Sequence, residues 1–281
     1  MPGPEVLRFA AFTTDPSGGN PAGVVLEVDG ADDAAMLAVA AEVGYSETAF
    51  LTPGPQPRTY AVRYFSPRAE VPFCGHATVA AGVALAERLG PGRFVLDTQA
   101  GTVTVDTAEA AGGVVATLES VPARSRPATE DEVTALLDAL HWEAGDLDPA
   151  WPPHVAFAGA AHPVLVAVSR ERLATLDYDF EGLQALMDRE AWTTVQLAHG
   201  DPRDSGTWHV RDPFPVGGVV EDPATGAAAA AFGAYLRQLG RARAGDRLLL
   251  LQGEDMGRPS RLEVEVGSER VRVGGRAVPI P

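Results

Sequence analysis

The sequence predicts an α+β protein of two similar halves, each with a mixed, mostly antiparallel sheet wrapped around one buried helix. Two helical stretches carry this prediction. Residues 77–89 (ATVAAGVALAERL) and 227–239 (AAAAAFGAYLRQL) have almost no polar face. A helix that is apolar all round belongs in the interior of a fold. Gly90 and Gly240 follow these stretches, where glycine favours the end of a helix.

A repeated order of sequence blocks is the second observation behind the two halves. Three pairs of blocks correspond: 20–28 with 162–169, 63–67 with 211–215 (both Arg-x-x-x-Pro), and 74–75 with 225–226. The last pair is offset by 225 − 74 = 151 residues. Each half therefore reads strand, helix, strand, strand, buried helix and hairpins.

The individual elements follow from periodicity and turn signals. In the first half we expect strands at 20–28, 47–52, 93–107 (a hairpin) and 112–119, with helices at 32–43 and 77–89. In the second half we expect strands at 162–169, 193–198, 247–253, 261–267 and 270–278, with helices at 180–189 and 227–239. The polar, Pro-containing stretch 122–130 places the boundary. The predicted halves are 1–122, with the last strand 269–281 as a candidate addition, and 123–268.

The composition excludes several classes of chemistry. All 22 basic residues are arginine, so a lysine imine, a pyridoxal phosphate Schiff base and a Walker A loop are excluded. Cys74 is the single cysteine, which excludes an intrachain disulfide and a multi-cysteine zinc site. The sequence also lacks the H-E-x-x-H and G-x-G-x-x-G patterns. We therefore expect no metal and no cofactor.

Charge and hydropathy constrain the partners and the location. A net charge of −16 disfavours nucleic acid and anionic membranes. The chain shows no signal-like start and no apolar run near the roughly 20 residues of a membrane span. A cytoplasmic protein that acts on a small metabolite is expected.

The starts of the two buried helices are candidate binding sites, because a helix N-terminus exposes unpaired N–H groups and attracts anions. Each nearby polar residue also has a purely structural interpretation. Asp222 could be an N-cap followed by Pro223 in the first turn. His76 could be a satisfied imidazole, and Cys74 a small buried apolar residue or a thiolate nucleophile. Glu47 is either an exposed strand-edge residue or a partly buried carboxylate suited to proton transfer.

Five blocks in one order resemble the PhzF family of phenazine-biosynthesis isomerases. They are GNPAGVVL (19–26), SETAFL (46–51), FCGHATVAAG (73–82), EDPATGAAAAA (221–231) and QGEDMGRPS (252–260). The resemblance covers nearly the whole chain. It implies a diaminopimelate-epimerase-like fold with an active site in the cleft between two halves, and a homodimer. It also implies a cofactor-independent isomerase of a small carboxylate metabolite, such as trans-2,3-dihydro-3-hydroxyanthranilate, an activity of phenazine biosynthesis.

The same resemblance assigns roles to individual residues. It implies that Glu47 carries a proton between two substrate carbons, while His76 and Asp222 orient the substrate and stabilise the intermediate. The implied substrate-binding positions are Gly75, Cys74, Thr225, Gly226 and Ala227. The family commonly has serine where this chain has Ala227, and the segment 211–218 departs from the usual Arg-x-Phe-x-Pro pattern. These departures predict a substrate different from the founding one.

Two alternatives remain open at this point. One is a two-base amino-acid epimerase or racemase that uses Cys74, although its counterpart Thr225 does not readily serve as the opposing base. The other is a catalytically silent member that binds a metabolite or a protein. Deuterium incorporation at a substrate carbon separates the enzymes from the binder.

Overall fold

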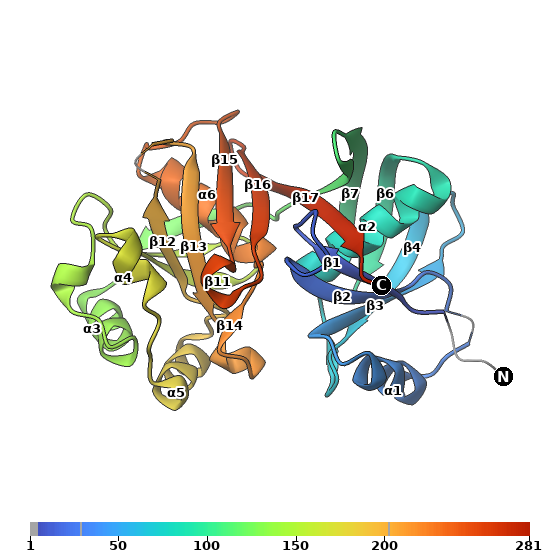
Figure 1. Ribbon diagram of the computed structural model, residues 1–281, viewed down its shortest axis with the longest axis horizontal. Helices are drawn as coiled ribbons and strands as arrows, with labels where there is room; N and C mark the ends of the chain where they lie inside the picture. Colours follow the sequence, from blue (N-terminus) through green and yellow to red (C-terminus); the bar gives the residue numbers. More distant parts are fainter. Residues whose placement is uncertain (1–4, 29, 202) are drawn as a thin grey trace. The chain divides into compact units, whose positions relative to one another are not determined.

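The computed structural model describes residues 5–28, 30–201 and 203–281, and the chain divides into two compact units. The first unit contains the residues up to Glu119 together with Gly274–Pro281, and the second unit is Ser120–Val273 (Figure 1). Across the described residues, no helix combines the length and apolar character that a membrane span requires.

Among its described residues, the first unit has nine strands and two helices. They are β1 (Leu7–Ala11), β2 (Asn20–Val25), α1 (Asp33–Val43), β3 (Glu47–Pro53), β4 (Thr59–Phe65), β5 (Glu70–Val71), α2 (Gly75–Leu89), β6 (Gly92–Thr98), β7 (Gly101–Ala110), β8 (Gly113–Glu119) and β17 (Val271–Pro279). The last strand, β17, begins at Val271, shortly before the chain re-enters this unit at Gly274. Strand pairing runs β17–β1–β2–β3–β4–β6–β7–β8 and returns from β8 to β17. The sheet thus closes on itself, and α2 packs against its inner face (Figure 1).

The part of the second unit that the structure describes contains eight strands, four α-helices and three short 3₁₀ helices. They are β9 (Arg124–Pro127), α3 (Glu130–Ala139), η1 (Ala144–Asp146), β10 (His154–Phe157), β11 (Ala161–Val166), α4 (Arg170–Ala174), α5 (Phe180–Glu190), β12 (Gln196–Gly200), β13 (Thr207–Pro213), η2 (Pro215–Gly217), β14 (Glu221–Asp222), α6 (Gly226–Gln238), β15 (Arg247–Gln252), η3 (Glu254–Met256) and β16 (Ser260–Val266). Pairing runs β9–β10–β11–β12–β13–β15–β16, and α6 packs against β9, β10 and β16.

Strand direction repeats between the units. In the first, β2–β3 and β4–β6 are parallel, whereas β1–β17, β1–β2, β3–β4, β4–β5, β6–β7 and β7–β8 are antiparallel. In the second, β11–β12 and β13–β15 are the parallel pairs. Each parallel pair needs a crossover, which α1 and α2 provide in the first unit, and α4, α5 and α6 in the second. The predicted mixed sheets around a buried helix are confirmed.

The two central helices are buried on nearly every side, as their composition predicts. Residues 76–86 of α2 and 228–236 of α6 are buried without interruption. A Cβ at Gly82 would lie 2.7 Å from Val105 Cγ1, and one at Gly233 would lie 3.1 Å from Val271 Cγ1. These glycines are 233 − 82 = 151 residues apart, the same offset as the helix starts. Both therefore allow the same close approach of helix to strand.

The predicted strand 193–198 is partly wrong, because β12 begins only at Gln196. The preceding residues instead make separate contacts: Thr193 N donates to Ala161 O, and Thr194 contributes its hydroxyl to a buried polar cluster. Polar side chains that satisfy one another inside the unit replace the regular ladder here.

Candidate active site

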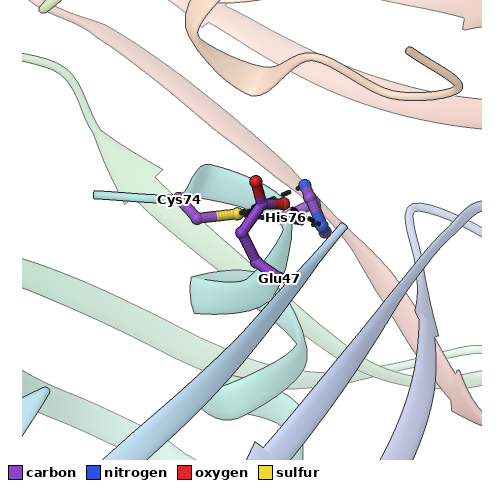
Figure 2. A group of neighbouring side chains, drawn as sticks. All are labelled: Glu47, Cys74 and His76. Atoms are coloured by element: carbon purple, nitrogen blue, oxygen red, sulfur yellow. Dashed lines mark hydrogen bonds and ion pairs between the residues drawn. The ribbon is translucent and has the colours of Figure 1, made fainter. Parts of the chain in front are cut away.

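Three functional side chains meet at the start of α2 in the first unit (Figure 2). Glu47 is the first residue of β3, Cys74 is the N-cap of α2, and His76 lies in the first helical turn. Parallel pairing places Glu47 opposite Ala22 of β2. The short strand β5 and the turn after it carry the chain back to the helix start. Residues far apart in sequence therefore converge.

The distances among these side chains are those of direct polar contacts. His76 Nε2 lies 3.3 Å from Glu47 Oε2. The Cys74 thiol lies 3.5 Å from the same carboxylate oxygen and 3.3 Å from His76 Nδ1. The thiol therefore points to the carboxylate and the imidazole, and does not cap its own helix.

Two further residues fix the orientation of His76. The Asn20 side-chain amide lies 3.2 Å from Nδ1, and Ser46 Oγ lies 3.3 Å from Nε2. With the Asn20 amide nitrogen facing Nδ1, that ring atom accepts, and Nε2 carries the proton toward Glu47. Neither residue was singled out from the sequence, although both lie in the blocks GNPAGVVL and SETAFL.

Hydrogen bonds from buried hydroxyl groups fix the first turn of α2. Thr78 Oγ1 donates to the Cys74 carbonyl at 2.6 Å and contacts Tyr64 Oη at 2.6 Å. Burial raises the pKa of Tyr64, so its hydroxyl stays neutral and serves as a hydrogen-bonding group. The Glu47 side chain keeps 17% of its surface exposed, against 8% for His76. The carboxylate is thus the member of the group that a ligand reaches most readily.

The donor atoms of Glu47, Cys74 and His76 lie within 4.8 Å of one another and form a possible metal-ligand set of oxygen, sulfur and nitrogen. The sequence does not predict this ligand set, because a single cysteine forms no recognisable metal-binding motif with partners 27 residues upstream and two residues downstream.

Asp222, Thr225, Gly226 and Ala227, the other predicted site residues, lie in the second unit. Asp222 ends β14, and the N-cap of α6 is Thr225. The interpretation of Asp222 as an N-cap is therefore wrong. The Thr225 hydroxyl donates to Asp222 Oδ2 at 2.5 Å, and Gln252 accepts from Thr225 N at 3.0 Å. Gln252 Nε2 also donates to Asp222 O at 2.8 Å, so one amide ties the strand to the helix start.

Strand register shows that the two helix starts are structural counterparts. Tyr64 pairs with Val71 and Phe65 with Glu70 in the first unit; Asp212 pairs with Asp222 and Pro213 with Glu221 in the second. Cys74 follows Val71 by three residues, as Thr225 follows Asp222. The counterpart of the Cys74 thiol is therefore the Thr225 hydroxyl, and Asp222 stands where the first unit has valine.

A buried carboxyl, Asp212, lies behind Asp222. Its Oδ1 accepts from Thr194 Oγ1 at 3.2 Å, and the same hydroxyl lies 2.9 Å from His162 Nδ1. Burial, reinforced by the nearby Asp222 charge, raises the pKa of Asp212 well above its usual range. Burial also lowers the pKa of His162 to about 4, so this imidazole is neutral. Sequence reasoning missed this cluster, because apolar neighbours conceal buried polar residues.

Asp212→Asn is expected to stabilise the protein at neutral pH. A carboxyl whose folded pKa is raised takes up a proton on folding, so the free energy of unfolding falls as pH rises from the unfolded pKa, about 3.9, to the folded one. Asparagine does not titrate, so the variant does not lose this part of the free energy of unfolding as pH rises. The difference in Tm between variant and wild type should be small near pH 4 and grow toward pH 8. The exposed Asp177→Asn is the control, and a constant difference across pH would contradict the assignment.

Comparison with known proteins identifies relatives of this chain. The family model described as PhzC-PhzF, phenazine biosynthesis-like protein, matches residues 9–281. The uncharacterized isomerase YfhB of Bacillus subtilis is 32% identical over 286 residues, which cover 98% of this chain and 96% of its own. The trans-2,3-dihydro-3-hydroxyanthranilate isomerase of Pseudomonas chlororaphis is 30% identical over 273 residues, which cover 95% and 94%.

A solved structure gives the same relationship in three dimensions. The structure of a predicted epimerase from Pseudomonas aeruginosa matches with a TM-score of 0.83 and 31% identity, and the match covers 98% of this chain and 96% of that one. Fold and relatives together define an isomerase with a diaminopimelate-epimerase-like α+β fold. The chain belongs to the PhzC-PhzF family, which confirms the resemblance seen in its five blocks.

Proposed function

We propose that this protein moves a proton between two carbons of a small carboxylate metabolite, with Glu47 as the acid and base. The observation that carries the proposal is the position of the Glu47 carboxylate. It is partly exposed, lies 3.3 Å from the His76 imidazole, and faces the first turn of α2. A carboxylate with one open side takes a proton from a bound molecule and returns it without a cofactor.

His76 and the helix start supply the complementary binding groups. Asn20 and Ser46 hold the imidazole in a fixed orientation. The side chain therefore loses little conformational entropy when it donates a hydrogen bond to a substrate oxygen. The unpaired N–H groups of the first turn suit a carboxylate. Apart from its chain neighbours and the backbone of its own helix, no atom of the described residues lies within 4 Å of a Cβ added at Gly75. Packing therefore does not explain glycine there, whereas close approach of a ligand to the backbone does.

Asp222 and Thr225 of the second unit are also proposed as substrate-binding residues. The Asp222 carboxylate is held by the Thr225 hydroxyl, and the adjoining backbone is tied by Gln252. An oriented carboxylate of this kind accepts hydrogen bonds from a hydroxyl or amino group of the substrate. Gly226 would offer its backbone N–H as Gly75 does.

The proposed substrate is a relative of trans-2,3-dihydro-3-hydroxyanthranilate and not that compound itself. One relative is named for the isomerisation of this compound. Ala227 removes a hydroxyl that the family commonly provides, and a lost hydrogen bond to a bound group costs about 1–3 kcal/mol. A metabolite without a polar group at that point avoids the loss.

The experiment that tests the function is deuterium incorporation. A panel of small unsaturated carboxylates is incubated with the protein in D₂O, and mass spectrometry measures exchange at carbon. Exchange that disappears in Glu47→Gln supports the proposal. Exchange that persists in Glu47→Gln rules out Glu47 as the proton carrier, and its further loss in Cys74→Ala would support a thiol-based epimerase. A protein that binds a panel member without exchange is a silent binder.

Metal removal gives an independent prediction. Proton transfer by a carboxylate needs no Lewis acid, so exhaustive chelation followed by gel filtration is expected to leave turnover within twofold of the untreated protein. The rate is measured before and after treatment, with metal content checked by mass spectrometry. Complete loss of turnover, restored by one added metal ion, would contradict the proposed chemistry.

A further inference from the structure

Three donor atoms of different elements form a triangle at the start of α2. Cys74 Sγ lies 3.7 Å from His76 Nε2 and 3.5 Å from Glu47 Oε2. His76 Nε2 lies 3.3 Å from Glu47 Oε2, which closes the triangle. All three side chains are drawn in Figure 2, where they point toward one another.

These separations match the face of a zinc coordination tetrahedron. Bonds of about 2.3 Å to sulfur and about 2.0–2.2 Å to nitrogen and oxygen place tetrahedral donors about 3.6 Å (S to N), about 3.6 Å (S to O) and about 3.4 Å (N to O) apart. Each observed edge differs from its ideal value by a small fraction of a bond length. The side chains therefore need little movement to share one ion.

We infer that Glu47, Cys74 and His76 form an inhibitory binding site for a thiophilic divalent cation of the Zn²⁺ class. The mixed sulfur, nitrogen and oxygen set suits Zn²⁺, whereas Mg²⁺ and Ca²⁺ prefer oxygen alone. Three protein ligands leave the fourth position to water, on the exposed side of Glu47. Such an open site binds reversibly and is unlike a closed structural zinc site.

The proton balance of binding is simple. The Cys74 thiol loses one proton to solvent when its sulfur bonds the cation. Nε2 must offer its lone pair, so the proton that the Asn20 contact assigns to Nε2 moves to Nδ1. Asn20 then turns its amide so that the carbonyl oxygen accepts from Nδ1–H, the usual support for a metal-bound histidine. Binding therefore releases one proton and strengthens as pH rises.

Occupancy would stop the proposed isomerase, and this step rests on the proposed function. A carboxylate bound to a cation does not take a proton from carbon, and His76 no longer faces the substrate. Zinc should therefore inhibit turnover, and a chelator should restore it.

The test reads binding without any substrate. Cobalt(II) is titrated into the metal-free full-length protein, and near-ultraviolet absorption is followed for the charge-transfer band of a cobalt–thiolate bond. Because Cys74 is the single cysteine, only ligation by this residue produces the band. We expect a saturable band that Zn²⁺ abolishes.

Matched variants complete the design, each checked for folding by thermal melt. Cys74→Ser should eliminate the band. Glu47→Gln and His76→Gln each remove a direct ligand. Loss of a residue that only supports a ligand already lowers metal affinity by about tenfold or more, so the affinity for cobalt should fall by more than about tenfold in each variant. His209→Gln is the control. This histidine sits 2.6 Å from Glu254 and 3.8 Å from Asp201 in the second unit, a cluster without sulfur.

The outcomes separate the two proposals. A missing band at millimolar cobalt, or a band unchanged in both Glu47→Gln and His76→Gln, overturns the metal site even if the protein proves to be an active isomerase. A band with the expected variant pattern supports the metal site even if no tested carboxylate exchanges deuterium, and the proposed function alone then fails.

Discussion

Glu47→Gln should reduce the maximal rate of proton exchange by about 10²–10⁴-fold, which is the usual contribution of a general acid–base group. The loss should reach the upper part of that range, because one carboxyl both removes and returns the proton. Glutamine keeps the shape of the side chain but carries no transferable proton. Substrate affinity should stay within a few-fold of wild type, since the lost interaction belongs to the transition state.

Three comparison variants make the result specific. His76→Ala and Asp222→Ala should weaken both binding and rate, because both residues are proposed to hold the substrate. Glu27→Gln is the matched control. Glu27 is an exposed glutamate of the first unit that pairs with Arg88 at 2.6 Å, and its loss should leave exchange unchanged. Rates and affinities are measured on folded protein. Near-wild-type exchange by Glu47→Gln would transfer the role of proton carrier to His76 or Asp222.

The fold was predictable because its signals are local or repeated. The composition of the two buried helices predicts them directly. Both α2 and α6 begin within two residues of the predicted start. Gly90 is the C-cap of α2, and Gly240 follows Leu239, the C-cap of α6, at a φ of 67°, so both glycines lie at the helix ends as expected. Turn residues separate β6 from β7 at the predicted hairpin. These features depend on neighbouring residues alone.

The site was predictable only where the chain is continuous. Cys74, Gly75 and His76 share one helix start, so their proximity follows from the sequence. Asn20 and Ser46 reach His76 from two other segments, and no local pattern indicates such contacts. Asp222 was given an alternative role as a cap because Asp-Pro commonly opens helices, but β14 pairs with β13 through Asp222 and delays the helix to Gly226.

Some expectations from the sequence stay predictions. They include the homodimer, the cytoplasmic location, the small anionic substrate and catalysis without metal or cofactor. Size-exclusion chromatography with light scattering measures the first of these directly.

The duplication supplies an internal control for the energy of a buried ion pair. In the second unit, Arg211 Nε donates to Glu221 Oε1 at 2.9 Å and Nη2 to Oε2 at 2.5 Å. In the first unit, Arg63 Nε and Nη2 donate to the two oxygens of Glu70 at 2.6 Å each. Both arginines thus hold their glutamate through Nε and Nη2, although Arg63 Nη1 also pairs with Asp33 at 2.7 Å. The side chains are 9% and 4% exposed in the second unit, against 33% and 20% in the first.

Arg211→Met should therefore destabilise the second unit far more than Arg63→Met destabilises the first. Removal of one partner leaves a buried Glu221 carboxylate without its cation, which costs about 3–5 kcal/mol. The partly exposed Arg63–Glu70 pair is closer to a solvent-exposed pair, which contributes only about 0–1 kcal/mol. For a unit of this size, about 2–4 °C of Tm corresponds to each kcal/mol, so Arg211→Met should lower Tm by about 10 °C.

The double variant Arg211→Met with Glu221→Gln decides the cause. It removes the uncompensated charge, and glutamine keeps the size of the Glu221 side chain, so the double variant should recover much of the lost stability. Calorimetry and urea unfolding measure all four proteins under the same conditions. Equal losses for Arg211→Met and Arg63→Met, or no recovery in the double variant, would show that packing of the arginine stem and its bond to Ala174 O at 2.6 Å, and not the buried charge, set the energy of this contact.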